Sequence, residues 1–364
     1  MLLQSLERSP ESDALRIMAS GQISWLGWRE GLTVEEAMPF IQEALQWAHE
    51  IDDSMIPLLI FVEARITGAS GGAADVYVKR VKEALSLLKP EEHMGRAATL
   101  NASLSHAYGW AGLLREALAA NNEAVQRLSN IDQFDHQFLG YNVEHWTRSL
   151  RARILIQLGR LSEAEEFLQM MIDASEVAPV DPTVQFIAHL GYVEIAWYSD
   201  DVLLAKKHAT RVAEIARKHG SPYLRVFSVS CNGTLKYIAK DFIGALVDFT
   251  ESLSFVRHAR VAVDFEPEIM ASLAECYLAA EQYERAVAIA IQTIDLAKQR
   301  TARLPEIRAL ISQGNALLAQ YGAASVVDAD VLLRRAEELI RITGAEFYMP
   351  GLEKAKERLL NVAA

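Results

Sequence analysis

Alanine recurs along the chain at intervals of about forty residues, and this spacing limits how the chain can fold. The intervals are 80, 47, 41, 40, 41 and 43 residues, and the first equals two repeats. A fixed period of roughly 20–50 residues is typical of helical hairpins that stack side by side, so we expect about eight hairpins. Each would have a small residue where its two helices pack closely. The positions are Ala37, Ala117, Ala164, Ala205, Ala245, Ala286 and Ala329.

The residues around these alanines resemble the tetratricopeptide consensus, in which an aromatic or apolar turn residue precedes a small residue by three positions. The resemblance implies a right-handed superhelix of hairpins. A period near forty residues, against about 34 in the standard motif, implies a longer first helix in each hairpin. The turn residues are Leu114, Leu161, Phe242 and Tyr283, before Ala117, Ala164, Ala245 and Ala286.

Prolines give an independent signal for where helices begin. Four of them precede runs with helical apolar periodicity, and proline in the first helical turn loses no intrahelical hydrogen bond. Asp181 and Ser221 precede two of these prolines and are expected to accept hydrogen bonds from the first-turn N–H groups. The prolines are Pro182, Pro222, Pro267 and Pro305.

Composition supports an all-α class. The chain has 364 residues, of which 51% are hydrophobic and 8% aromatic, and it lacks the period-two β-branched runs that indicate strands. No linker rich in Gly, Ser or Pro divides it. We therefore predict an all-α, tetratricopeptide-like solenoid that forms a single domain over residues 1–364. A weak point is expected near 129–144, within the longest interval.

Charge and cysteine usage exclude several functions. The net charge is −12 and no basic stripe is visible, which argues against nucleic-acid binding. The longest apolar run, 55–62, is far shorter than the ~20 residues that span a bilayer, so we expect no membrane partner. Cys231 and Cys276 have no metal-ligand spacing and are typical of a reduced, cytoplasmic protein.

No catalytic or cofactor motif is present in the sequence. Phosphate-binding loops of the Gly-x-x-x-x-Gly-Lys and Gly-x-Gly-x-x-Gly types are absent, as is His-Glu-x-x-His. Residues 68–72 match Gly-x-Ser-x-Gly around Ser70, but a helical pattern precedes them where a hydrolase needs a strand. We therefore predict that the chain is not an enzyme and binds no cofactor or metal.

The tetratricopeptide resemblance also implies a binding groove. With each alanine at position 20 of its repeat, positions 2, 5, 9 and 12 of the first helix line the concave face. Aromatic and charged residues there suit an extended peptide or a neighbouring domain. Alternatively, the aromatic residues belong to the core: the two interpretations weigh equally for the tryptophans, and core is favoured for Phe227. The groove candidates are Trp146, Arg153, Glu194, Trp197, Phe227, Thr234, Tyr237 and Glu275.

Longer segments resemble a narrower group: the C-terminal helical region of large bacterial proteins that combine a class III adenylate or guanylate cyclase, an AAA-type signal-transduction ATPase and a tetratricopeptide tail. This resemblance implies a regulatory module that binds the cyclase or ATPase domain, in cis or in trans. The catalytic residues of that family have no counterparts here. The segments are 19–37, 69–85, 115–125, 181–197 and 221–228.

Two alternative functions stay open at this point. One is a freestanding superhelical receptor for a peptide or a small signalling ligand. The other is an unrecognised enzyme in the groove, where Glu194, Arg153 and a histidine would converge.

Overall fold

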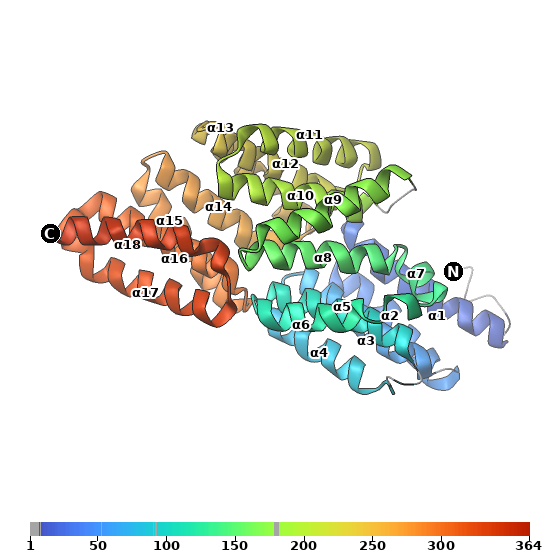
Figure 1. Ribbon diagram of the computed structural model, residues 1–364. Helices are drawn as coiled ribbons and strands as arrows, with labels where there is room; N and C mark the ends of the chain where they lie inside the picture. Colours follow the sequence, from blue (N-terminus) through green and yellow to red (C-terminus); the bar gives the residue numbers. More distant parts are fainter. Residues whose placement is uncertain (1–6, 8, 52, 90, 92, 178–181) are drawn as a thin grey trace.

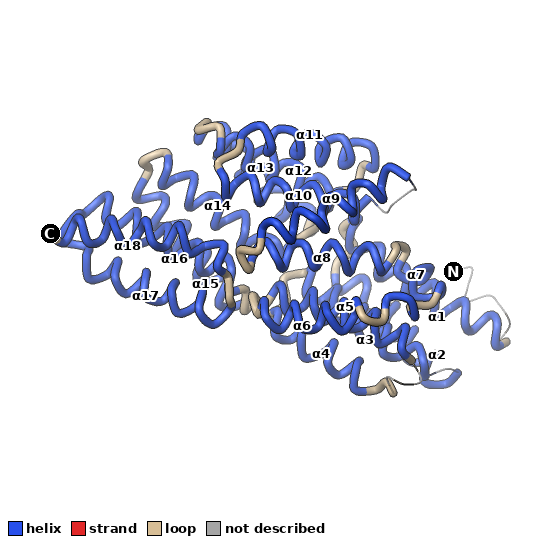
Figure 2. Tube along the Cα trace, viewed as in Figure 1, coloured by secondary structure: helices blue, strands red, loops and turns tan. Residues whose placement is uncertain are grey.

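The chain folds into helical hairpins that stack into a superhelix (Figures 1 and 2). The computed structural model describes residues 7, 9–51, 53–89, 91, 93–177 and 182–364, and these ranges contain no strand. Eight hairpins lie in this part of the chain, which confirms the predicted class. They are α1 (Pro10–Gly27) with α2 (Val34–Ile51), α3 (Ile56–Ala69) with α4 (Ala74–Ser86), α5 (Met94–Trp110) with α6 (Leu114–Val125), α8 (Val143–Gln157) with α9 (Leu161–Val177), α10 (Pro182–Ser199) with α11 (Val202–His219), α12 (Pro222–Ile238) with α13 (Phe242–Ala259), α14 (Glu266–Ala279) with α15 (Tyr283–Gln299), and α16 (Arg303–Tyr321) with α17 (Val326–Thr343).

Further elements lie between and after the hairpins. Helix α7 (Gln133–Leu139) is inserted before the fourth hairpin, and α18 (Met349–Ala363) follows the last one. Short 3₁₀ helices occupy several connections: η2 (Trp28–Glu30), η3 (Asp53–Met55), η4 (Leu128–Asn130), η5 (Val263–Phe265), η6 (Gly322–Ser325) and η7 (Glu346–Tyr348).

The recurring alanines pack where the two helices of a hairpin meet. All seven are fully buried, and each is the fourth residue of the second helix of its hairpin. The second hairpin has Tyr77 at this place instead. Gly68 of α3 lies beside this side chain: a Cβ at Gly68 would be at ordinary contact distance from the Tyr77 ring, 3.8 Å, and only 3.0 Å from the Trp110 ring. Close helix approach therefore explains the recurring alanines.

The prolines stand at helix starts, as predicted. Pro182 and Pro222 are the first residues of α10 and α12, and the other two lie in the first turns of α14 and α16. The expected cap at Ser221 is wrong: its hydroxyl donates to the carbonyl oxygen of Arg29 at 3.4 Å and caps no N–H group of α12. Asp181 lies outside the described residues.

Loops late in the chain, which belong to the second turn of the superhelix, pack against loops of the early hairpins, which form its first turn. We call this line of loop contacts the seam. The backbone N–H of Ala74 donates to the Arg300 carbonyl at 2.8 Å. The Arg303 guanidinium donates to the Ala111 carbonyl at 2.6 Å, and Arg115 donates to the Arg341 carbonyl at 3.3 Å. Residues about five hairpins apart in sequence are thus in contact, and the superhelix closes on itself.

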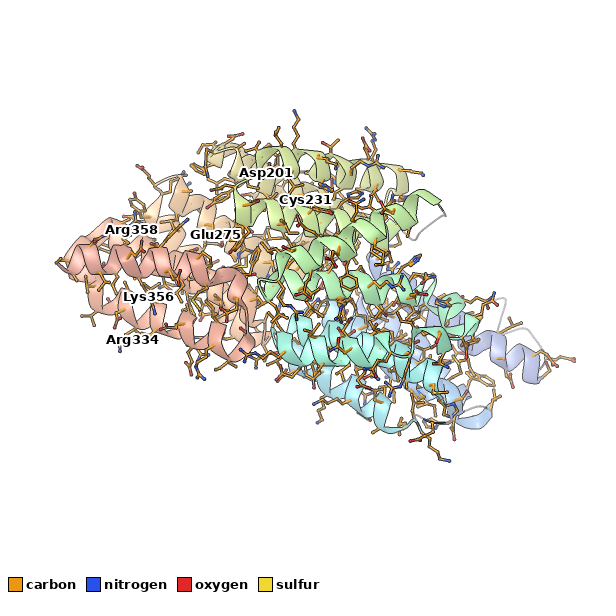
Figure 3. The ribbon with its side chains drawn as sticks, viewed as in Figure 1. Asp201, Cys231, Glu275, Arg334, Lys356 and Arg358 are labelled. Atoms are coloured by element: carbon orange, nitrogen blue, oxygen red, sulfur yellow. The ribbon has the colours of Figure 1, made fainter. Side chains whose placement is uncertain are left out.

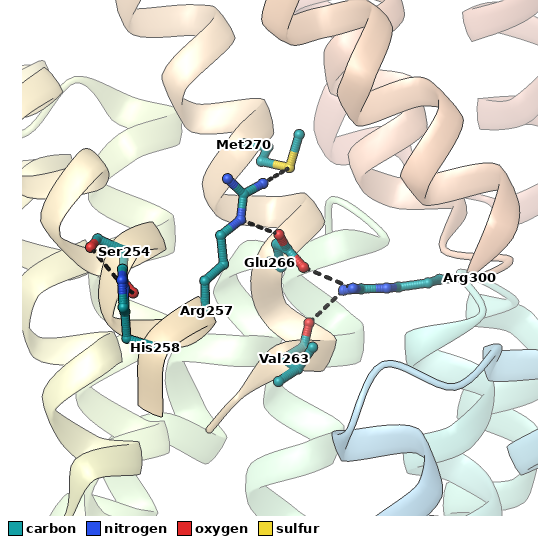
Figure 4. Close-up of polar contacts among 7 residues, drawn as sticks. All are labelled: Ser254, Arg257, His258, Val263, Glu266, Met270 and Arg300. Carbon is teal, nitrogen blue, oxygen red and sulfur yellow. Dashed lines mark hydrogen bonds and ion pairs between the residues drawn. The ribbon is translucent and has the colours of Figure 1, made fainter. Parts of the chain in front are cut away.

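Arg300 holds the loop of the second turn that meets this seam (Figure 4). Its guanidinium donates to the Val263 carbonyl at 2.5 Å and pairs with the Glu266 carboxylate at 2.7 Å. Glu266 also accepts from Arg257 at 2.7 Å. One carboxylate therefore fixes two arginines from different helices, and the loop that receives α4 is held in place.

In each of the first four hairpins, the turn between the two helices reaches the seam. A glycine occupies this turn in every case. Each such glycine has a positive φ, a backbone conformation that costs other residues energy. At Gly112 a Cβ would lie 2.9 Å from the Cβ of Arg303. The three following hairpins have Asp200, Lys240 and Glu281 at the equivalent place, also with positive φ. The four glycines are Gly31, Gly71, Gly112 and Gly159.

We expect Gly112→Ala to lower the free energy of unfolding by about 1–3 kcal/mol, because the side chain adds backbone strain and a clash at the seam. Glu281→Gly is the control. It is expected to change stability by less than about 0.5 kcal/mol, because relief of strain offsets the added chain entropy. Urea denaturation measures both. A similar loss in the two variants would contradict a role of the seam.

Helix α7 fills the longest interval between alanines and lies within 129–144. The Trp25 indole donates to the Leu139 carbonyl at 2.8 Å, so α7 is tied to α1. The Asp135 carboxylate is buried and accepts from Arg96 at 2.8 Å. These contacts place α7 against the first and third hairpins. That 129–144 is a weak point, and that residues 1–364 act as one domain, stay predictions.

One stretch, 303–343, has the length and hydropathy of a membrane-spanning helix by composition alone. In the structure it consists of α16, η6 and α17, and the two helices fold back against each other.

Candidate functional site

The superhelix encloses a cavity of about 190 Å³. The first helices of the third to eighth hairpins contribute to its walls, and the inserted helix α7 does not. The 3₁₀ helix η7 contributes two aromatic residues. Figure 3 labels two wall residues, Cys231 of α12 and Glu275 of α14. Because the seam closes the superhelical turn, side chains from distant parts of the sequence face a common interior.

A regular register brings one residue from each of five hairpins to this cavity. For five of the seven recurring alanines, the residue eleven positions earlier lines the wall, because equal repeats present the same face of the first helix inward. These residues are His106, Arg153, Glu194, Thr234 and Glu275.

Six of the eight groove candidates line the cavity: Arg153, Glu194, Trp197, Thr234, Tyr237 and Glu275. Their role in binding stays a prediction.

Trp146 is not part of the cavity wall. It is 7% exposed, and its ring lies 5.3 Å from that of Tyr141 and 5.7 Å from that of His106. The alternative that placed Trp146 in the core describes its position. Trp197, by contrast, lines the cavity and stacks on Phe347 at 5.5 Å.

Phe227 lies in the core, as favoured from the sequence. It is 4% exposed, and its ring is 4.6 Å from that of Phe265 and 5.1 Å from that of Phe186.

Two ion pairs form part of the cavity wall, and each joins two neighbouring first helices. Arg308 binds Glu275 through two hydrogen bonds of 2.8 and 2.7 Å and also donates to the Ser272 hydroxyl at 2.9 Å. Arg153 makes one bond to Glu194, at 2.7 Å. The first pair is bidentate and well satisfied, whereas the second leaves polar atoms of both partners unused. The Arg153 Nε and the Glu194 Oε2 have no hydrogen-bond partner among the described residues.

Glu268 lies between these pairs on α14, one helical turn before Ser272. Burial raises its pKa to about 7, nearby Asp264 adds to the rise, and Arg308 and Arg153 oppose it. Burial also raises the pKa of Asp264 to about 6. Glu268 is therefore partly protonated at neutral pH, and the cavity contains an acid that can change its charge in the physiological range.

We expect Glu268→Gln to become more stable relative to the wild type as pH rises. The folded-state pKa of about 7 exceeds the ordinary value of 4.5, so the folded chain binds more protons between these values and loses stability as pH increases through them. The advantage of the variant should grow by on the order of 2–3 kcal/mol from pH 5 to pH 8. Thermal unfolding across this range measures it, with exposed Glu116→Gln as the control. Parallel profiles for wild type and Glu268→Gln would contradict the assignment.

Burial also shifts the pKa of both wall thiols and of the wall imidazole toward the neutral form. Burial raises the pKa of both Cys231 and Cys276, so the thiolate form is disfavoured. Burial lowers the pKa of His106 well below its usual range, and its Nδ1 lies 3.4 Å from the Tyr77 hydroxyl. Among the residues that the structure describes, no group of three His, Cys, Asp or Glu side chains could hold a metal ion.

Two charged wall residues, Glu268 and Arg308, are not among the groove candidates predicted from the sequence. Glu268 stands at position 2 of its hairpin, the place of Trp146 and Phe227 in theirs, so the same register identifies it. Arg308 does not follow the register, because η6 lengthens the connection between α16 and α17. Eleven positions before Ala329 stands Leu318, which is buried.

The chain resembles solved structures in fold but matches no family model and no curated protein by sequence. A crystal structure of a Rap protein complexed with competence and sporulation factor superposes with a TM-score of 0.55 at 13% identity. The alignment covers 97% of this chain and 100% of that one. Two further structures superpose less well. Aspartyl phosphate phosphatase F from Bacillus subtilis gives 0.46 at 10% identity, covering 98% and 94%, and yeast Tom70 gives 0.28 at 10%, covering 97% and 91%. The similarity to the Rap protein shows that this chain has the fold of a tetratricopeptide-like α-solenoid.

Proposed function

We propose that this chain is a non-catalytic interaction module that binds a short peptide or an exposed segment of a partner protein in the cavity of its superhelix. The observation that carries the proposal is the cavity itself, which combines aromatic side chains with ion-paired residues from consecutive hairpins. Concave sites with apolar walls and a few convergent polar groups are the usual places for ligands. The protonated thiols and the neutral His106 give no support to the alternative of an enzyme in the groove.

The Rap protein with this fold is in complex with competence and sporulation factor. At 13% identity, that complex says nothing of which ligand this chain binds. The proposal therefore depends on the lining residues, and a small signalling ligand in place of a peptide is a second outcome that the same cavity accommodates.

A finer proposal concerns the partner. Segments such as 19–37 and 181–197 resemble the tails of nucleotide cyclases, and they support a cytoplasmic regulatory role toward a cyclase or AAA-type ATPase domain in cis or in trans. Isothermal titration with a purified cyclase domain and a purified ATPase domain of that family tests it. Saturable binding to either is expected, and no binding to both would overturn it.

Gly109 offers a way to block the cavity without disturbing the fold. It lines the cavity in the last turn of α5, and a Cβ added there would meet nothing within 4 Å. Gly109→Phe therefore fills the interior. Gly351 of α18 is the matched control, because it is exposed, helical, outside the cavity, and also has nothing within 4 Å of an added Cβ.

The test selects peptides from a random displayed library on the wild-type chain and measures their dissociation constants. We expect Gly109→Phe to weaken binding by at least about a hundredfold, because the aromatic ring occupies the ligand's space. Gly351→Phe should bind as the wild type does. Peptides that bind both variants equally would place binding elsewhere and overturn the proposed function.

A further inference from the structure

The cavity wall has more unpaired hydrogen-bond acceptors than donors. With Glu268 ionised, three side-chain oxygens that face it are buried acceptors without a hydrogen-bond partner in the described structure: Glu194 Oε2, Glu268 Oε2 and Gln157 Oε1. The Arg153 Nε is an unpaired donor, and the Ser105 hydroxyl can serve in either role. Buried acceptors without partners are costly, so a ligand that donates to them gains more than one that accepts.

Each arginine of the wall is already paired with a carboxylate. Arg308 is engaged by both oxygens of Glu275 and by Ser272, and its guanidinium lies 5.7 Å from the Trp197 ring. Arg153 is paired with Glu194. An anionic ligand would have to displace these carboxylates and then face them. The residues therefore disfavour a phosphate or carboxylate group in the interior.

The net charge of the wall also favours a ligand with a cationic group. Three glutamates face two arginines, so the wall has one negative charge in excess when all are ionised: Glu194, Glu268 and Glu275 against Arg153 and Arg308. A cationic ligand group balances that excess.

The aromatic wall suits a planar or compact cation. Trp110 and Trp197 both line the cavity, and each already has an arginine near its ring. Arg65 stands 4.3 Å from the Trp110 ring, and Arg308 stands 5.7 Å from the Trp197 ring. Aromatic faces attract such groups, most strongly where water is excluded.

Building on the proposed function, we propose that the ligand presents a guanidinium or ammonium group to Glu194 and Glu268, with its apolar part against the aromatic wall. The side chain of an arginine or lysine within a peptide provides this chemistry, and so does a free alkyl amine or guanidine. The carboxylates accept the N–H groups, and the two wall arginines keep those carboxylates in place.

Binding of this cation is coupled to a proton. Glu268 is faced by Asp264 of η5, Arg153 of α8, Arg308 of α16 and Tyr348 of η7. Because the pKa of Glu268 is about 7, a cation bound beside it favours the charged form and releases a proton. Affinity for the cation should therefore rise as pH increases from 6 to 8, and Glu268→Gln should remove most of this dependence.

The experiment uses pools of acetylated pentapeptide amides in which one position is fixed as Arg, Lys, citrulline or Glu and the others are mixed apolar residues. Agmatine alone is the small-molecule arm. Titration calorimetry with the whole chain measures each. The Arg and Lys pools should bind at least about tenfold more tightly than the citrulline pool, and the Glu pool should bind weakest. Glu194→Gln should weaken the Arg pool by about tenfold and leave the citrulline pool unchanged.

The outcomes separate this inference from the proposed function. Equal binding of the Arg and citrulline pools, abolished by Gly109→Phe, would overturn the cationic ligand and leave the peptide receptor standing. Preference for the Glu pool would do the same. Binding of agmatine but of no pool would support the cation and assign it to a small molecule. No binding by any pool or by agmatine would overturn the inference. Circular dichroism checks that Glu194→Gln folds, and the pH profile of Glu268→Gln gives an independent variant.

Discussion

Ala286→Leu is expected to lower the free energy of unfolding by about 1–3 kcal/mol, because three added carbons have no room where α15 packs against α14. Ala286 is completely buried, and it is the fourth residue of α15, the place of every recurring alanine. In a stacked array, a change at this place disturbs the interfaces with both neighbouring hairpins. The loss should therefore appear in the unfolding of the whole chain.

Ala288→Leu on the same helix is the matched control, since Ala288 is exposed. Both changes put leucine in place of alanine in a helix interior, so helix propensity is nearly equal. Urea denaturation followed by circular dichroism compares the two. A loss of similar size in both would mean that close helix packing does not explain the recurrence of alanine.

The second large effect concerns the Glu275–Arg308 ion pair in the cavity wall. Glu275→Ala should lower the free energy of unfolding by about 3 kcal/mol, because Arg308 would keep its charge with only the Ser272 hydroxyl and the Glu268 carbonyl oxygen as hydrogen-bond partners. The side chains of Glu275 and Arg308 are 14% and 15% exposed, so water screens them poorly. Chemical denaturation at neutral pH measures the change.

The exposed pair Arg211–Glu214 provides the comparison. Its side chains are 52% and 42% exposed, and an exposed pair contributes roughly 0–1 kcal/mol. Glu214→Ala should therefore change stability by less than about 1 kcal/mol. If Glu275→Ala cost no more than Glu214→Ala, the cavity would have to be well hydrated, and the argument from unpaired acceptors would lose its basis.

The local features of the fold could be predicted from the sequence because they repeat. Close packing requires a small residue in each hairpin, so Ala245 and Ala286 reveal the period. Because the period is nearly constant, the residue eleven positions earlier faces the interior. This register identified Arg153, Glu194 and Glu275 before their contacts were known.

The seam could not be predicted in the same way, because it depends on how small rotations between hairpins add up over a whole turn. A signal was nevertheless present: Gly31, Gly71 and Gly112 have nearly the same spacing as the alanines. Glycine is common in any hairpin turn, so this spacing alone does not predict a contact with a distant part of the chain. That Arg308 lines the cavity could not be predicted for another reason: η6 changes the length of its repeat, so the eleven-residue register does not point to it.

Fluorine NMR of the chain labelled with 5-fluorotryptophan tests the central claim most directly. The chain has six tryptophans; of these, Trp110 and Trp197 line the cavity, and Trp47 of α2 does not. Single Trp→Phe variants assign the signals. Titration with a selected peptide is expected to shift the resonances of Trp110 and Trp197 and leave that of Trp47 in place. A saturable shift of Trp47 without change at Trp110 and Trp197 would contradict binding inside the superhelix.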